Sequence, residues 1–177
     1  MRVIITVISI ILSYPCYADS SNYLLGGVGI NESIVNPEFD TSNVRREYDT
    51  FSLQGFVGRR FNNNIQLEFG YTQQQNLDIL GILDEIDISE FLILTGYRLD
   101  ISEHFKLVPR VGISRWKIKS SEGYLFNSGP EQQSSVSGSN TIFMLSAFVD
   151  IIYITYQTTD YDYGLHTSLI IGVEIEL

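Results

Sequence analysis

The last nine residues alternate between two faces, and this alternation restricts the fold more than any other feature of the sequence. One face is wholly apolar and comprises Leu169, Ile171, Val173, Ile175 and Leu177. The opposite face is mostly small or acidic and comprises Ile170, Gly172, Glu174 and Glu176. Successive side chains of a strand point to opposite sides. A two-faced strand at the carboxyl end is the expected closing strand of a barrel whose outer surface contacts lipid.

Residues 1–18 have the features of a cleavable signal peptide. Arg2 precedes an apolar run at 3–12 that is too short to span a bilayer, and Cys16 and Ala18 suit cleavage before Asp19. We therefore expect a signal peptide at 1–18 and a barrel domain at 19–177. Cleavage there removes the only cysteine, so no disulfide or thiol chemistry is expected. The remaining chain has ten Lys/Arg and 21 Asp/Glu. Its net charge of −11 argues against nucleic acid as a partner.

Candidate strands alternate with connections that are long and short in turn. The candidate strands are 22–33, 50–61, 65–74, 87–99, 105–119, 141–149, 151–159 and 166–177. The long connections are 34–49, 75–86, 120–140 and 160–165, and the tight ones are 62–64, 100–104 and the turn at Asp150. Short turns on one side and long loops on the other are typical of outer-membrane barrels. The pattern predicts an all-β fold, an eight-stranded antiparallel up-and-down transmembrane barrel.

The two faces of the candidate strands support this prediction. In 65–72, apolar side chains alternate with Gln66, Glu68, Gly70 and Thr72, as a narrow lumen requires. Leu92 and Leu94 are apolar on the inner face, and Pro109 predicts a local bulge because it lacks a ladder donor. Six aromatic residues near strand ends are predicted to form the interfacial girdles, the alternative being that some fill the lumen: Tyr23, Tyr71, Tyr97, Trp116, Tyr153 and Tyr156.

Three stretches resemble the OmpA/OmpX-like family of eight-stranded outer-membrane barrels. They are Leu67-Glu68-Phe69-Gly70-Tyr71, Arg110-Val111-Gly112-Ile113-Ser114-Arg115-Trp116 and the closing segment 168–177, with Thr95-Gly96-Tyr97 as a weaker match. The resemblance implies a bacterial outer-membrane location and an assembly signal at Val173, Ile175 and Leu177. The family usually ends in an aromatic residue read by the barrel-assembly machinery, whereas this chain ends in Leu177. The family's interior charge quartet is also incomplete, so a gated salt-bridge switch is not carried over.

Seven charged residues are predicted to face the lumen: Arg60, Glu68, Arg98, Lys106, Arg110, Glu174 and Glu176. Unpaired buried charge is costly, so these groups must pair. Eight strands leave room only for side chains, which favours a polar plug over a narrow ion-conducting pore.

His166 and Ser168 form the one catalytic-looking pattern, because a His-x-Ser pair beside an acid can activate a hydroxyl. Outer-membrane lipid A deacylases resemble it, but their Asn-Ala-Gly continuation is absent, and Glu174 and Glu176 lie toward the opposite rim. The acidic stretch 84–90 lacks the spacing of a calcium loop and is interpreted as a solvated rim.

We therefore expect a non-enzymatic outer-membrane protein without a cofactor or metal, with an adhesive, structural or envelope-integrity role; a lipid A-modifying enzyme and a pore remain the alternatives. The expected partners are outer-membrane lipids and lipopolysaccharide, the assembly machinery with periplasmic chaperones, and host or environmental ligands of the outer loops. The barrel is expected to be a monomer.

Overall fold

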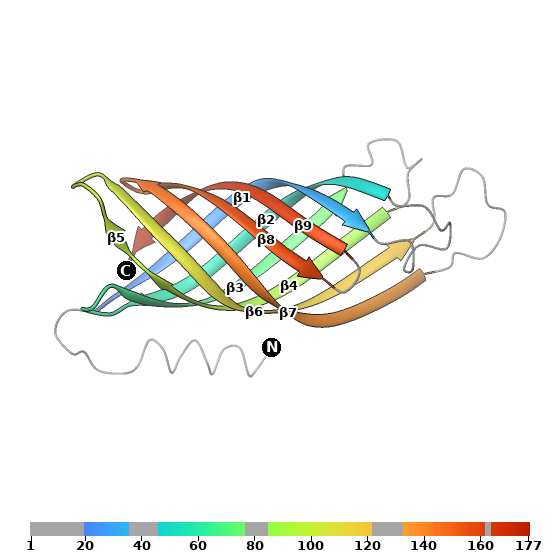
Figure 1. Ribbon diagram of the computed structural model, residues 1–177, viewed down its shortest axis with the longest axis horizontal. Helices are drawn as coiled ribbons and strands as arrows, with labels where there is room; N and C mark the ends of the chain where they lie inside the picture. The colour runs from blue at the N-terminus through green and yellow to red at the C-terminus, as the bar shows by residue number, and fades with distance from the viewer. Residues whose placement is uncertain (1–19, 36–45, 77–84, 122–132, 162–163) are drawn as a thin grey trace.

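The computed structural model describes residues 20–35, 46–76, 85–121, 133–161 and 164–177, and their strands form one antiparallel sheet that closes into a barrel (Figure 1). The strands are β1 (Ser21–Val35), β2 (Arg46–Arg60), β3 (Ile65–Asn76), β4 (Glu85–Tyr97), β5 (Leu99–Asp100), β6 (Phe105–Ser121), β7 (Gln133–Val149), β8 (Ile152–Tyr161) and β9 (Gly164–Glu176). Each long strand pairs with its neighbours in sequence; β9 pairs with β1, and β4 with β6. Because β5 has only two residues, the wall consists of eight long strands, and the predicted barrel is confirmed.

The strands are strongly staggered around the barrel. A walk through directly paired residues starts on β1 and crosses all eight long strands: Tyr23, Gly58, Glu68, Leu94, Gly112, Ile142, Thr159, His166 and finally Ser33. The walk returns to β1 ten residues beyond its start. With ordinary strand spacings, this stagger tilts the strands by about 40° from the barrel axis.

The two rims differ in how the strands are joined. Tight turns at 61–64, 101–104 and 150–151 lie at the rim that also holds the C-terminus (Figure 1). Asn64 and Asp150 adopt positive φ there, at 64° and 53°. The strand ends at the opposite rim are connected through 36–45, 77–84, 122–132 and 162–163, which lie outside the described residues. We refer to the rim with the tight turns as the periplasmic rim and to the opposite rim as the outer rim, because short turns face the periplasm in outer-membrane barrels.

Strand β7 begins earlier than the sequence predicts. Residues 133–140 are rich in Ser and Gly and were expected to form part of a long connection. They pair instead with β6 in unbroken register as far as Ser121↔Gln133. The cross-strand ladder therefore outweighs the weak strand propensity of this stretch.

Pro109 interrupts one ladder without producing the predicted bulge. The β4–β6 register runs to Gly96↔Arg110 and resumes unshifted as Leu99↔Leu107 between β5 and β6. The missing pairs lie opposite Val108 and Pro109, and the β6–β7 ladder stays continuous through Pro109↔Leu145. Because Pro109 has no N–H to donate, the ladder is interrupted between β4 and β5, and no extra residue is inserted.

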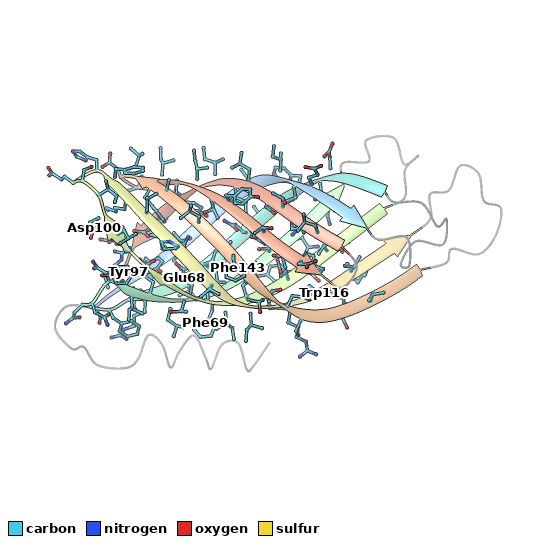
Figure 2. All side chains as sticks on the ribbon, viewed as in Figure 1. Glu68, Phe69, Tyr97, Asp100, Trp116 and Phe143 are labelled. Carbon is cyan, nitrogen blue, oxygen red and sulfur yellow. The ribbon has the colours of Figure 1, made fainter. Side chains whose placement is uncertain are left out.

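The outer surface of the barrel is apolar, and large side chains project from it around the wall (Figure 2). Ile30, Leu53 and Ile113 are 68, 59 and 63% exposed. A continuous belt of this kind is stable only in lipid. None of the described residues forms a helix long and apolar enough to cross a membrane.

Of the six aromatic residues predicted for the interfacial girdles, three face outward, as a girdle requires, and three do not. Tyr71, Tyr97 and Tyr156 lie on the outer surface. Tyr23, Trp116 and Tyr153 instead point into the lumen, where each is at most 2% exposed. Their phase explains this, since Trp116 shares the face of Arg110 and Ser114 along β6. Nearness to a strand end does not determine the face; odd or even position does.

Candidate functional site in the barrel lumen

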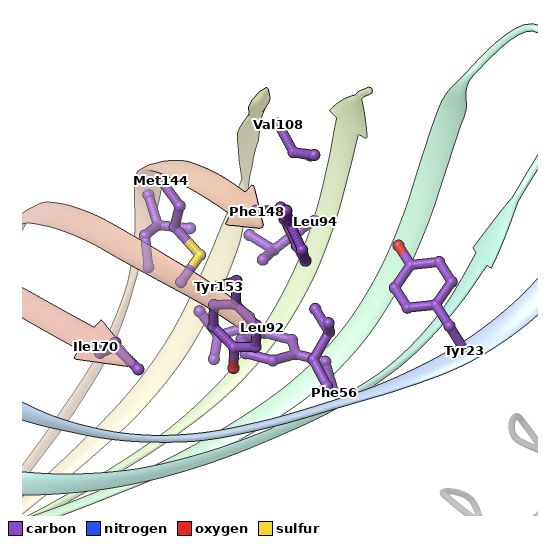
Figure 3. Close-up of a cluster of buried hydrophobic side chains, with 11 residues drawn as sticks. Tyr23, Phe56, Leu92, Leu94, Val108, Met144, Phe148, Tyr153 and Ile170 are labelled. Atoms are coloured by element: carbon purple, nitrogen blue, oxygen red, sulfur yellow. The ribbon is translucent and has the colours of Figure 1, made fainter. Parts of the chain in front are cut away.

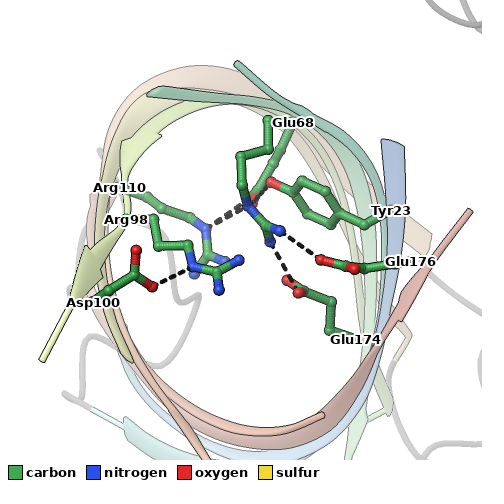
Figure 4. Close-up of polar contacts among 8 residues, drawn as sticks. Tyr23, Glu68, Arg98, Asp100, Arg110, Glu174 and Glu176 are labelled. Carbon is green, nitrogen blue, oxygen red and sulfur yellow. Dashed lines mark hydrogen bonds and ion pairs between the residues drawn. The ribbon is translucent and has the colours of Figure 1, made fainter. Parts of the chain in front are cut away.

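Glu68 of β3 and Arg110 of β6 form a buried ion pair in the lumen (Figure 4). Arg110 Nε lies 2.8 and 2.9 Å from the two carboxylate oxygens, and the side chains are 3 and 1% exposed. Tyr23 Oη donates to Glu68 Oε1 at 2.6 Å, and the guanidinium also donates to Ser146. Gly58 lies between Tyr23 and Glu68 in the register, and a Cβ there would meet the Tyr23 ring. The glycine therefore leaves the space through which Tyr23 reaches the carboxylate.

A second charged group joins β2 to the closing strand. Arg60 donates to Glu174 at 2.9 Å and to Glu176 at 2.7 Å, and its guanidinium lies 5.0 Å from the ring centre of Tyr23. Because β1 lies between β2 and β9, these contacts span the seam where the sheet closes. Leu177 N also donates to Asn22 O at 2.9 Å. The residues predicted as the assembly signal, Val173, Ile175 and Leu177, are all exposed on the outer side of this seam.

The other two predicted interior charges lie near the periplasmic rim and take no part in these networks. Arg98 pairs locally with Asp100 at 2.8 Å, and the side chains are 14 and 47% exposed. Lys106 is partly buried, and among the described residues it forms no ion pair. The structure thus brings five of the seven predicted charges into two networks and leaves Arg98 and Lys106 outside them.

An apolar layer lies beside these charges and fills the middle of the lumen (Figure 3). Its members include Phe56, Leu92, Leu94, Ile142, Met144, Phe148 and Ile170. Tyr153 packs in the same layer and accepts a hydrogen bond from Gln54 at 3.1 Å. A Cβ at Gly27 or Gly172 would lie within 2.6 Å of the Tyr153 hydroxyl, so these glycines make room for it. Close packing of this kind leaves little room for an ion path.

Toward the outer rim the lumen becomes polar again beneath an aromatic pair. Trp116 and Tyr161 meet edge to face at 5.5 Å, and Trp116 Nε1 donates to Asn140 at 2.6 Å. Tyr161 Oη donates to Glu90 Oε1 at 2.9 Å. Glu90 is fully buried, so the prediction of a solvated acidic rim is wrong for this residue. Its phase with Leu92 and Leu94 was the available signal.

His166 and Ser168 are brought together in this upper region. His166 Nε2 lies 2.8 Å from Ser168 Oγ, and the His166 ring lies 5.7 Å from that of Tyr161. Both residues point inward and are at most 1% exposed. The barrel wall therefore lies between this pair and the outer surface of the barrel. Among the described residues, no group of three or more His, Cys, Asp or Glu side chains is placed to hold a metal ion.

Comparison with solved structures identifies the architecture. Neisserial surface protein A, NspA, superposes with a TM-score of 0.62 at 12% identity, over 90% of this chain and 99% of that one. Ail, the attachment invasion locus protein of Yersinia pestis, superposes with a TM-score of 0.55 at 17% identity, over 89% of this chain and 99% of that one. No protein-family model and no curated protein matches the sequence.

The closed wall, the apolar exterior and the lumen occupied by charged, polar and apolar side chains define an integral membrane barrel. The chain has the fold of the eight-stranded outer-membrane β-barrels of the OmpA/OmpX-like type.

Proposed function

We propose that this barrel is a sealed anchor that holds its outer segments at the cell surface, where they bind host or environmental ligands. The observation that carries the proposal is the filled lumen, in which the Glu68–Arg110 pair and the apolar layer occupy the space that a channel requires. A barrel that neither conducts nor catalyses contributes through its surface, and loops on a rigid scaffold commonly carry function. An Ail structure contains the heparin analogue sucrose octasulfate, and it superposes on this chain with a TM-score of 0.53 at 17% identity.

The height of the wall supports a role for one part of the outer rim. Strands β6 and β7 have 17 residues each, whereas β8 has ten. Their pairing continues beyond the end of β8, so the outer ends of β6 and β7 stand farther from the membrane than the outer end of β8. In the sequence, residues 122–132 join β6 to β7. This segment is the proposed principal contact region.

The test is adhesion by bacteria that display the full-length protein. We expect cells expressing the barrel to bind cultured cells and immobilised sulfated glycans better than cells without it. Replacing 122–132 with a short Gly-Ser linker should abolish most of the gain. A matched replacement of the periplasmic turn 62–64 should not. A heat-dependent gel shift verifies folding of each variant, and equal binding with and without the barrel refutes the proposal.

Two experiments address the alternatives. The sealed lumen predicts no stepwise conductance in planar bilayers, and conductance that changes on Arg110 substitution would establish a pore instead. A non-catalytic role predicts unchanged lipid A by mass spectrometry. A modification lost in His166→Ala or Ser168→Ala would establish the enzyme.

The export and assembly steps are proposals of the same kind. Residues 1–18 are proposed to be removed before Asp19, and N-terminal sequencing of the outer-membrane form tests this. The chain is proposed to pass through periplasmic chaperones to the barrel-assembly machinery and to function as a monomer with surrounding outer-membrane lipid.

A further inference from the structure

The outward face of β6 changes abruptly from apolar to basic toward the outer rim. Its lower outward positions are Pro109, Val111 and Ile113, and the next three are Arg115, Lys117 and Lys119. All six are exposed. Alternate residues of a strand are about 7 Å apart, so the three cations form a row about 14 Å long. We refer to Arg115, Lys117 and Lys119 as the basic row.

The neighbouring strands supply hydroxyl groups beside this row. On β7, serines stand directly opposite each cation, in the pairs Arg115↔Ser139, Lys117↔Ser137 and Lys119↔Ser135. All three serines are exposed. Ammonium, guanidinium and hydroxyl groups are the usual side-chain donors to phosphate oxygens. The two strands together present a donor-rich surface on the outside of the wall.

The basic row is unusual in the charge distribution of this chain. The sequence has only 11 Lys/Arg and a net charge of −10, yet three of these cations occupy consecutive outward positions of one strand. In the described parts of the chain, no carboxylate forms an ion pair with any of the three. Asp87 stands opposite Lys119, but its carboxylate accepts a hydrogen bond from Gln73.

The depth of the row indicates what it contacts. Phe91, which is 51% exposed, stands directly opposite Arg115. Ile113, one outward position below Arg115, stands opposite Thr141, where the outward face of β7 becomes polar. The apolar belt therefore ends on β4, β6 and β7 at one level, and the cations begin there. Basic groups immediately above such a belt lie in the lipid headgroup layer.

We propose that the basic row and its serines bind the phosphate groups of lipopolysaccharide in the outer leaflet. The glycolipid's acyl chains would lie against the apolar belt below, and its phosphates would receive donors from Arg115 and Lys117 first. On another part of the outer rim, Glu32 stands opposite Asp49, and both are exposed, so these two carboxylates disfavour phosphate binding there.

The test compares two double variants that each remove one Arg and one Lys. The full-length barrel, R115Q/K117Q and R98Q/K106Q are placed in phosphatidylcholine nanodiscs, and binding of bisphosphorylated lipid A is measured by native mass spectrometry. R115Q/K117Q should weaken binding about 30-fold, since each cation near an anionic surface contributes about 1 kcal/mol. R98Q/K106Q removes the same charge near the periplasmic rim and should leave the affinity unchanged. Dephosphorylated lipid A should bind all three proteins equally and weakly.

Three results overturn the proposal. One is equal lipid A affinity in the two double variants. Another is a failure of the wild-type barrel to prefer the phosphorylated lipid. The third is a loss of binding to a soluble sulfated glycan in R115Q/K117Q without a loss of lipid A binding, which would assign the row to a glycan ligand. A gel shift confirms that each variant is folded before binding is measured.

Discussion

Removing either partner of the buried Glu68–Arg110 pair should destabilise the barrel far more than removing both. In R110M the carboxylate keeps only the Tyr23 donor, and in E68L the guanidinium keeps only Ser146. Each single change leaves a buried charge without its partner and should cost about 3–5 kcal/mol. In the double variant only the Tyr23 hydroxyl loses its acceptor, at about 1–3 kcal/mol. The coupling energy should therefore be at least about 3 kcal/mol.

Urea unfolding in detergent micelles measures these costs, and the fluorescence of Trp116 reports unfolding because it is the only tryptophan. The Arg98–Asp100 pair provides the control, since its carboxylate is 47% exposed and Asp100→Asn should cost less than about 1 kcal/mol. Additive single and double effects at Glu68 and Arg110 would mean that the pair is solvated, and the argument for a sealed lumen would fail.

The other predictions concern the seam, the lumen packing and assembly. Arg60→Met should lower stability by about 1–3 kcal/mol in the same urea assay, because two glutamates of β9 lose their shared cation; no change would show that these contacts do not hold the seam. Gly70→Ala should cost about 1–3 kcal/mol because its Cβ overlaps the Phe56 ring, whereas Gly26→Ala, with open space around it, should be nearly neutral. A nearly neutral Gly70→Ala would contradict the tight packing. Leu177→Phe should speed membrane insertion in a timed gel-shift assay, and an unchanged rate would show that a terminal ring is not limiting.

Much of the barrel could be predicted from the sequence because two separate patterns encode it. Odd or even position along a strand determines the face, and this correctly placed Glu68, Arg110, Leu92 and Leu94 inside. Turn lengths gave the strand order. The extent of β7 was missed because a Ser/Gly-rich stretch has little strand propensity of its own, and its ladder to β6 is a property of the pair.

The lumen aromatics and Glu90 were missed for a different reason. Tyr23, Trp116 and Tyr153 were assigned by closeness to the strand ends, and Glu90 by the acidity of its neighbours. Neither criterion distinguishes the two faces of a strand. Glu90 has the same phase as Leu92, and Trp116 the same phase as Arg110, and this phase places both residues inside.

The contacts between interior residues depend on the stagger, which no single strand encodes. The strand register leads from Glu68 through Leu94 to Gly112, two strands away. Glu68 nevertheless forms its ion pair with Arg110, two residues earlier on β6. Strand tilt brings that earlier residue to the same depth in the barrel. Phase alone predicts which charges face inward, and tilt determines which of them meet. The closing strand combines both effects, because Glu174 reaches Arg60 across the seam while Val173, on the opposite face, is exposed on the outside of the barrel.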